Sequence, residues 1–349
     1  MTLEQTYLTM KTKLAHVVPD VEIRYKAELA YEINKLKKER NAVILGHNYM
    51  EPALYHSIPD FTGDSLYLSR VAAKTDADII VFCGVEFMAE TAKILNPTKT
   101  VLIPSQKAGC SLAASITAED VRQLKAMFPG VPVVTYVNTY ADVKAESDIC
   151  CTSGNAHAVV ESLGTDTVIF LPDEYLAGNV AKETGKHIIF PTKSPKLHYD
   201  TTLDYVRAKP GMIGWHGRCE VHEKFTVQDI QAVRAQFPEV VILAHPECSP
   251  EVVAASDYSG STTGMIRFVE QTHAPQYLLL TECAMGDNIA AENPDKDMLR
   301  LCSVRCPHMN QITLEDTLAA LQHTQYEVHV PEDIRVRAAR AVERMIAIG

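Results

Sequence analysis

The 349-residue sequence lacks the segments that mark secreted and membrane proteins. Its first residues, 1–15, contain lysines and a glutamate but no continuous apolar stretch, so no signal peptide is visible. No window approaches the roughly 18 to 20 apolar residues that span a bilayer. We therefore expect a cytoplasmic protein that does not insert into a membrane.

Positive charge is also scarce. The chain carries 33 Lys and Arg against 44 Asp and Glu, which gives a net charge of −11. This balance disfavours broad electrostatic binding to nucleic acid or to an anionic membrane surface. A small anion can still bind where local donors converge, so the charge excludes these large partners without identifying a ligand.

Two further absences concern motifs. The nine cysteines are an odd number in a chain without a visible secretion signal, which disfavours a disulfide framework and favours reduced thiols. Cys302 and Cys306 form a C-x3-C pair, but no second half-site has matching spacing, so an ordinary zinc site is not indicated. No predicted strand runs into G-x-G-x-x-G, which disfavours a nicotinamide-dependent dehydrogenase.

What the sequence does contain is one unit repeated three times. Each copy begins with a β-rich run that ends in a polar tripeptide, and the tripeptides are His47-Asn48-Tyr49, Tyr136-Val137-Asn138 and His245-Pro246-Glu247. A hydroxyl residue follows the first residue of each tripeptide by 18, 17 and 17 positions, namely Ser65, Ser153 and Thr262. A second β-rich run ends 37, 36 and 36 positions after the same residues. This shared register predicts three related domains.

The alternation of short strands and helices predicts an α/β fold built from three homologous three-layer αβα sandwich domains with short parallel sheets. We expect them to pack around a pseudo-threefold axis. The predicted parts are an N-terminal helical segment (1–40) and domains at 41–110, 111–218 and 219–330. A C-terminal helix at 331–349 is expected to pack back on the first domain.

Two details complete this prediction. Apolar residues at helical spacing indicate an amphipathic helix from Asp20 to Arg40. Each unit is expected to add a further short strand, near Leu102, Ile189 or Leu301. The Pro-containing stretch at 191–214 does not fit the repeat, and we expect it to extend the edge of the second domain or to form a loop over the site.

Ligands of open parallel sheets bind outside the carboxyl ends of the strands, where the three tripeptides lie. A threefold arrangement would turn all three toward one cavity. Cys110, Cys219 and Cys306 each lie on a loop after the last strand of their unit, so the same arrangement would bring three thiolates together. Three thiolates suit an iron–sulfur cubane with one iron free of protein ligands, and that iron could act as a Lewis acid.

The alternative for an isolated cysteine is a small buried apolar residue, which is the commoner role. The matched position in three units argues against it for these three. We interpret Cys83, Cys150, Cys151 and Cys283 as core residues, because they lie within or beside predicted strands. Cys302 ends an apolar run and is left out of the cluster.

Several longer strings resemble those of the quinolinate synthase family, in the family's order, from about Glu28 to the end of the chain. They are Gly46-His47-Asn48-Tyr49, Gly63-Asp64-Ser65-Leu66, Phe87-Met88-Ala89-Glu90-Thr91-Ala92-Lys93, Tyr136-Val137-Asn138, Cys219-Glu220-Val221-His222, His245-Pro246-Glu247, Gly260-Ser261-Thr262 and Cys306-Pro307-His308-Met309.

The resemblance implies three homologous domains around one [4Fe–4S] cluster, with Cys110, Cys219 and Cys306 as its ligands. It also implies a transferase reaction in which iminoaspartate and dihydroxyacetone phosphate give quinolinate, phosphate and water, on the route to NAD. The pathway implies a functional link to an enzyme that oxidises aspartate.

Such a condensation needs groups that transfer protons, and His, Tyr and Glu in a shielded pocket are suitable. We expect Tyr49 and His47 to move protons on the triose and Glu247 to act as acid or base during the dehydrations. Tyr49 could instead be an aromatic residue that covers the core at a strand end.

The remaining site residues are expected to bind substrate, with His47 and Glu247 contributing to binding as well. They are Ser65, Tyr136, Asn138, Ser153, His222, His245, Ser261 and Thr262. The four hydroxyl residues among them precede predicted helices, whose free amides and dipole favour carboxylate or phosphate. Their alternative role is ordinary N-capping. Glu90 and Lys93, at i and i+3 of a predicted helix, could be only a surface ion pair.

Two other functions stay open at this point. One is a three-domain iron–sulfur enzyme that cleaves S-adenosylmethionine, which would share the dispersed cysteines but not need the polar tripeptides. The other is an iron–sulfur sensor or binding protein without turnover.

Overall fold

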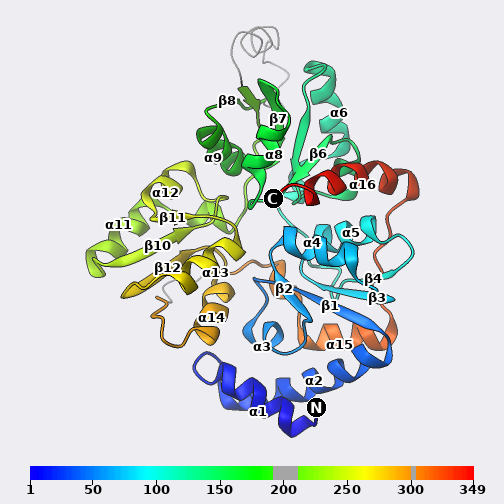
Figure 1. Cartoon of the computed structure of the whole chain (residues 1–349), viewed down its shortest axis with the longest axis vertical. Helices are drawn as coiled ribbons and strands as arrows, with labels where there is room; N and C mark the ends of the chain where they lie inside the picture. The colour runs from blue at the N-terminus through cyan, green and yellow to red at the C-terminus, as the bar shows by residue number, and fades with distance from the viewer. Residues whose placement is uncertain (192–210, 300–303) are drawn as a thin grey trace.

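The structure, a computed structural model, describes residues 1–191, 211–299 and 304–349. Its strands form three short, all-parallel sheets flanked by helices, and the sheets lie around a common centre (Figure 1). The central strands are buried along most of their length, because helices cover both faces of each sheet. The predicted α/β class with repeated αβα sandwich units is confirmed.

The first sheet has the order β2-β1-β3-β4. Its strands are β1 (Ala42–His47), β2 (Phe61–Gly63), β3 (Ile79–Cys83) and β4 (Thr100–Leu102), and its helices are α3 (Pro52–Tyr55), α4 (Ser65–Lys74) and α5 (Glu86–Leu95). Two N-terminal helices, α1 (Leu3–Leu14) and α2 (Asp20–Glu39), precede it. The buried residues of α2, such as Ile23, Ala30 and Ile33, lie on one face, as the helix predicted at Asp20–Arg40 requires.

The third sheet repeats this topology with the order β11-β10-β12. Its strands are β10 (Val240–Ala244), β11 (Tyr258–Ser259) and β12 (Gln276–Leu280), and its helices are α11 (Val227–Gln236), α12 (Pro250–Ala255), α13 (Thr262–Gln271) and α14 (Cys283–Glu292). In both sheets the first strand of the unit lies in the middle and its two successors flank it, so the repeat seen in the sequence is also a repeat of topology.

The second sheet has five strands in the order β6-β5-β7-β9-β8. They are β5 (Val133–Tyr136), β6 (Ile149–Cys151), β7 (Thr167–Leu171), β8 (His187–Ile189) and β9 (Gly211–Ile213), with helices α6 (Ala118–Met127), α7 (Ala141–Ala145), α8 (Ala156–Ser162) and α9 (Glu174–Thr184). β9 pairs with β7 as β4 pairs with β3, while β8 forms the edge.

The strand predicted near Ile189 therefore exists, but it does not hold the place of the strand near Leu102. That place belongs to β9, near the end of the 191–214 stretch. The stretch therefore adds a strand inside the second sheet, between β7 and β8, and not at the edge that we expected. Residues 192–210 of the stretch and the strand predicted near Leu301 lie outside the described residues.

The last two helices return to earlier parts of the chain. Helix α15 (Leu314–His323) packs against α2 and β3, and α16 (Glu332–Ile346) packs against α7 and β6 of the second unit and α5 of the first. The predicted domain limits stay predictions. In the part of the chain that the structure describes, no helix has both the length and the apolar character needed to cross a membrane.

Candidate functional site

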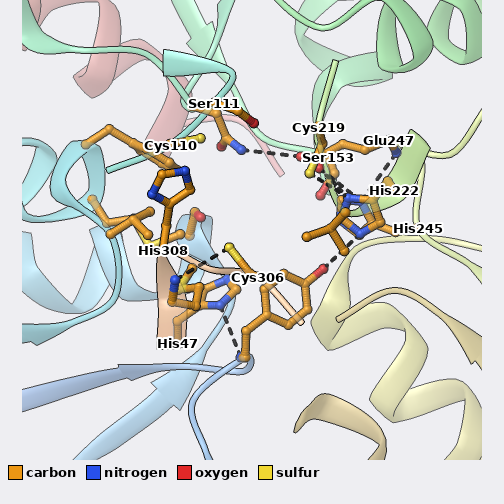
Figure 2. A pocket seen from close by; sticks show the side chains of 18 of the residues that line it. His47, Cys110, Ser111, Ser153, Cys219, His222, His245, Glu247, Cys306 and His308 are labelled. Carbon is orange, nitrogen blue, oxygen red and sulfur yellow. Dashed lines mark hydrogen bonds and ion pairs between the residues drawn. The ribbon is translucent and has the colours of Figure 1, made fainter. Parts of the chain in front are cut away.

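One pocket lies between the three units, at the carboxyl ends of their strands. Figure 2 shows side chains from all three units turned toward it. With the exception of Ser261, every site residue predicted from the sequence lines it: His47, Tyr49, Ser65, Cys110, Tyr136, Asn138, Ser153, Cys219, His222, His245, Glu247, Thr262 and Cys306. Segments from all three units, far apart in the sequence, thus meet at one site.

Each of the three pocket cysteines is the first residue of a turn with the same backbone hydrogen bonds. The amide of the residue four positions later donates to each cysteine carbonyl, at 3.0, 3.0 and 3.1 Å for Cys110, Cys219 and Cys306. A 3-10 turn starts three residues after each cysteine, and amides of this turn donate to the sulfur. Equivalent backbone therefore presents an equivalent sulfur in each unit.

A helix follows each of these turns at the same distance. Seven residues after each cysteine a threonine caps the helix, and its side chain accepts from the amide of an aspartate at the third helical position. The pairs are Thr117 with Asp120, Thr226 with Asp229, and Thr313 with Asp316. The pattern C-x6-T-x2-D thus occurs three times. This signal lies in the sequence and strengthens the grouping of the cysteines, but our sequence analysis missed it.

The environment of the sulfurs disfavours free thiolates. Burial raises the pKa of Cys110 to about 12 and that of Cys306 to about 11, and it raises the pKa of Cys219 well above its ordinary value. The amide donors only partly offset this effect. A cationic group bound between the cysteines would reverse the balance, so the three residues are suited to hold a metal cofactor.

The histidines of the first and third tripeptides have the same geometry. The Tyr49 amide donates to His47 Nδ1 at 3.2 Å, and the Glu247 amide donates to His245 Nδ1 at 3.3 Å. Burial lowers the pKa of His47 to about 4 and that of His245 to about 3, so both rings are neutral near pH 7. With Nδ1 accepting, the proton is on Nε2, which leaves each ring one donor for a ligand.

Glu247 is the centre of a buried hydrogen-bond network. Its Oε1 accepts from the Tyr136 hydroxyl at 2.5 Å and from Asn138 Nδ2 at 3.3 Å, and its Oε2 lies 2.7 Å from His222 Nδ1. Burial by itself would raise the pKa of Glu247, but His222, His245 and the hydrogen bonds outweigh it and lower that pKa. The site therefore contains a buried carboxylate that stays ionised.

The Tyr49 hydroxyl belongs to a second network. It lies 2.5 Å from Thr281 Oγ1 and 3.4 Å from His222 Nε2, and His222 Nε2 in turn lies 2.9 Å from Thr281 Oγ1. Burial and the nearby Glu247 raise the pKa of Tyr49 well above its ordinary value. The phenol is therefore protonated and bonded at its polar end, unlike an aromatic ring that only covers the core. Thr281, the residue directly after β12, closes this network, and the sequence analysis gave it no role.

Of the four hydroxyl residues expected before helices, only Ser261 is an N-cap, and it accepts from the Gly264 amide at 3.2 Å. Ser65 and Thr262 are the first residues of α4 and α13, and Ser153 precedes α8 without capping it. Ser261 also donates to Asp64 Oδ2 at 3.1 Å. Ser261 does not line the central pocket, and its oxygen is used in these two bonds.

Two buried asparagines hold the tripeptide turns from neighbouring units. Asn179 of α9 donates to the carbonyls of Pro246 and Cys248, at 2.8 and 3.1 Å. Asn288 of α14 donates in the same way to the carbonyls of Asn48 and Met50, at 3.2 and 2.9 Å. Both asparagines are the sixth residue of their helix. The second unit thus fixes the turn of the third, and the third fixes the turn of the first.

Comparison with known proteins agrees with this architecture. The family described as "Quinolinate synthetase A protein" matches residues 31–347. The chain is 50% identical to quinolinate synthase 2 of Mesorhizobium japonicum, over 99% of both chains. It is 51% identical to the quinolinate synthase of Agrobacterium fabrum, over 96% of this chain and 90% of the relative. It is 53% identical to that of Xylella fastidiosa, over 90% and 86%.

The chain belongs to the quinolinate synthase family. It is therefore an enzyme, and the resemblance noted from its motifs is confirmed over nearly its whole length.

Several lining residues of this family member carried no role in the sequence analysis. They are Asp64, Ser111, Thr152, Glu220 and His308, together with the apolar Phe87 and Met88. His308 Nε2 lies 3.0 Å from Glu220 Oε1, which links the loops of Cys306 and Cys219. Ser111, Glu220 and His308 each lie within two residues of a pocket cysteine, and this proximity was the signal available in the sequence.

The cysteines outside the pocket divide into two groups. Cys83, Cys150 and Cys151 are fully buried thiols, as expected for core residues. The prediction for Cys283 was wrong: it begins α14, is partly exposed and is disulfide-bonded. Cys283 is the first residue of α14 and lies three residues after the end of β12. Cys302 lies outside the described residues.

Proposed function

We propose that this enzyme condenses iminoaspartate with dihydroxyacetone phosphate to form quinolinate, with release of phosphate and water, in NAD biosynthesis. We further propose that it does so with a [4Fe–4S] cluster held by Cys110, Cys219 and Cys306, leaving one iron without a protein ligand. One observation carries this proposal. Three equivalent cysteine turns, one from each unit, line the same pocket as the His-Asn-Tyr and His-Pro-Glu tripeptides.

The donor set fits a cluster better than a single ion held by the three cysteines. Among the described residues, the cysteine sulfurs do not form a group within 4.8 Å of one another. A single ion would need its ligands closer than that, since a zinc–sulfur bond is only about 2.3 Å long. A cubane has its irons at separate corners and accepts thiolates that line a wider pocket. When bound, the open iron would supply Lewis acidity toward a substrate oxygen.

Substrate anions have donors on several sides of the pocket. Nε2–H of His47 and of His245 can each donate to a carboxylate or carbonyl oxygen. Ser65 and Thr262 add hydroxyls at the first turns of α4 and α13, where free amides and the helix dipole favour an anion. Asn138 and Ser153 line the same pocket from the second unit. These groups would orient the two carbon skeletons and exclude water from between them.

Proton transfer would be divided between two networks. Glu247 is an ionised base that Tyr136 and His222 hold in place, so it can take a proton from a bound carbon acid and return it to a leaving hydroxyl. Tyr49 is a protonated phenol beside Thr281 and His222, so it can donate at the other substrate. His47 is neutral and can polarise a triose carbonyl through Nε2–H.

The family match over nearly the whole chain favours this function over an S-adenosylmethionine-cleaving enzyme and over a non-catalytic iron–sulfur sensor. We propose that the reaction takes place in the cytoplasm, where thiols such as the seven free cysteines of the described residues stay reduced. We also propose that an aspartate-oxidising enzyme supplies the iminoaspartate.

Anaerobic purification followed by absorption and Mössbauer spectroscopy should show one [4Fe–4S] cluster per chain. The same preparation, given iminoaspartate and dihydroxyacetone phosphate, should form quinolinate and phosphate in equal amounts. A fully loaded protein that forms neither product would refute the proposed reaction. Activity that survives complete removal of iron would refute the role of the cluster.

A further inference from the structure

Three different metal-ligand atoms converge on one side of the pocket. Cys219 Sγ lies 3.2 Å from His222 Nδ1, and Glu247 Oε2 lies 2.7 Å from the same nitrogen. All three atoms lie within 4.8 Å of one another, and His222 and Glu247 are almost completely buried. Figure 2 shows these side chains gathered on the side of the pocket away from Cys110 and Cys306.

Hydrogen bonding accounts for this cluster only in part. His222 Nε2 already faces Thr281 Oγ1, so Nδ1 is the nitrogen that faces both the sulfur and the carboxylate. One N–H can make a good hydrogen bond to only one of two acceptors that lie in different directions. A divalent cation between the three atoms would satisfy the sulfur, the nitrogen and the oxygen together. It would also neutralise a buried carboxylate and thiolate.

We propose that, when the chain holds no iron–sulfur cluster, Cys219, His222 and Glu247 bind a single divalent transition-metal ion of the zinc type. Three protein ligands with sulfur, nitrogen and oxygen atoms are a set that Zn²⁺ accepts in tetrahedral geometry, with the fourth position open to water or a substrate oxygen. Thiolate and imidazole ligands in tetrahedral geometry favour Zn²⁺ among the divalent ions of the first transition row. Binding releases the thiol proton of Cys219 to solvent and requires the neutral His222 tautomer with its proton on Nε2, where it can donate to Thr281 Oγ1.

This site and the cluster exclude each other, because both require the Cys219 thiolate. An ion held here would withhold one of the three cysteines from an assembling cluster and would also occupy Glu247. We therefore infer that zinc-type ions block cluster assembly in this protein at about one equivalent per chain. The ion site itself depends only on three side chains of the cluster-free chain, so it can be tested without reference to the proposed reaction.

Co²⁺ is a suitable probe, because a tetrahedral Co²⁺–thiolate site absorbs visible light and Zn²⁺ does not. Titration of the full-length, cluster-free chain under anaerobic conditions should show one Co²⁺ per chain, with a thiolate-to-cobalt charge-transfer band. One equivalent of Zn²⁺ should displace it. Cys219→Ala should abolish the band. Loss of an outer-shell partner already costs about 10–100-fold in affinity, so His222→Gln and Glu247→Gln should weaken binding at least tenfold.

Cys110→Ala and Cys306→Ala are matched controls, since each removes a pocket cysteine that is outside the trio. Both should keep the charge-transfer band and bind Co²⁺ within about threefold of the unmodified chain. Zn²⁺ should also raise the Tm of these two variants but not that of Cys219→Ala, because an ion stabilises only the folded chain that binds it. Glu247→Asp provides a second carboxylate variant if Glu247→Gln does not fold.

Three results would overturn the proposal. The cluster-free chain could bind no Co²⁺. It could bind Co²⁺ without the charge-transfer band. The band could disappear in Cys110→Ala or Cys306→Ala, which would assign the ion to the three cysteines. A measurement of bound iron after cluster reconstitution with one equivalent of Zn²⁺ tests the consequence: iron incorporation should fall by more than half in the unmodified chain.

Discussion

Tyr49 shows how a single side chain of the pocket can be tested. Its hydroxyl is bonded to Thr281 and His222, and its ring is packed beside His47 at 4.7 Å between ring centroids. Phenylalanine keeps the ring and removes only the proton-transfer group. We expect Tyr49→Phe to lower the rate of quinolinate formation by about 100-fold or more, with cluster absorbance unchanged.

Tyr7→Phe is the matched control for this change. Tyr7 is also buried, and its hydroxyl donates to Asp20 at 2.6 Å, but it lies on α1, remote from the pocket. It should keep full activity. A Tyr49→Phe enzyme with near-normal turnover and an intact cluster would remove Tyr49 from the proposed mechanism.

Glu90 gives a pH-dependent prediction. Burial raises its pKa to about 7, and its Oε2 accepts from the Ala141 amide at 2.9 Å. The folded chain therefore holds a proton that the unfolded chain releases above about pH 4.3, so the free energy of unfolding falls as pH rises from there to 7. Glu90→Gln removes this loss. Relative to the unmodified chain, the variant should gain on the order of 3 kcal/mol of stability between pH 5 and pH 8.

Urea denaturation at the two pH values measures this difference. Glu332→Gln is the control, because Glu332 is exposed on the first turn of α16 and Arg335 lowers its pKa. That variant should show no such gain. A Glu90→Gln stability difference that stays constant with pH would mean that Glu90 titrates as an ordinary surface carboxylate.

For single residues, the sequence predicted which side chains line the pocket better than it predicted which residues they bond to. The polar tripeptides and the three cysteines carry enough repetition to identify most of the pocket lining from the sequence alone. The partners of Glu90 and Lys93 did not follow from helical spacing. Glu90 bonds to Ala141, and Lys93 donates to the Lys99 carbonyl and pairs with Glu327. These partners all lie outside α5, and a periodic pattern within one helix does not identify them.

At the scale of elements, the asparagines on α9 and α14 determine how the tripeptide turns are held. Asn179→Ala would leave the carbonyls of Pro246 and Cys248 without their buried donor. We expect it to lower the free energy of unfolding by about 1–3 kcal/mol. Because this turn carries His245 and Glu247, quinolinate formation should fall further than the loss of folded protein explains.

Asn288→Ala tests the equivalent pair of hydrogen bonds at the turn of the first unit, and it should lower stability and activity by similar amounts. Asn293→Ala, at the end of α14, is the control, because its side chain donates to Ile289 of its own helix, at 3.0 Å, and not to a tripeptide turn among the described residues. It should change activity little. Equal specific activity per folded molecule in all three variants would show that the asparagines contribute to stability without positioning the site.

The order of strands and helices was predictable where the units share the same repeat. Strands and helices of the first and third units followed from the common register. The second unit departs from it through β9, whose three residues follow a long Pro-containing stretch and carry no periodic signal of their own. β9 pairs with both β7 and β8. Which strands pair with each other depends on the folded arrangement, and a local sequence pattern does not specify it.

At the scale of the whole molecule, the three cysteines connect the three units. Replacement of any one of Cys110, Cys219 or Cys306 by Ala should remove most of the bound iron and the cluster absorbance, since each supplies one-third of the proposed ligands. Cys83→Ala is the control, because Cys83 is a fully buried thiol in β3, away from the pocket. It should retain iron. Normal iron content in one of the three pocket variants would exclude that cysteine as a ligand.

The asparagine contacts have a consequence for the origin of this architecture. A helix of the second unit holds the turn of the third, and a helix of the third holds the turn of the first, so two of the three tripeptide turns depend on a neighbouring unit. A closed ring of three identical small chains would make the same head-to-tail contacts. Fusion into one polypeptide lets the three turns differ, as His-Asn-Tyr, Tyr-Val-Asn and His-Pro-Glu do. Three unequal corners can offer different contacts to the two dissimilar reactants of the proposed reaction.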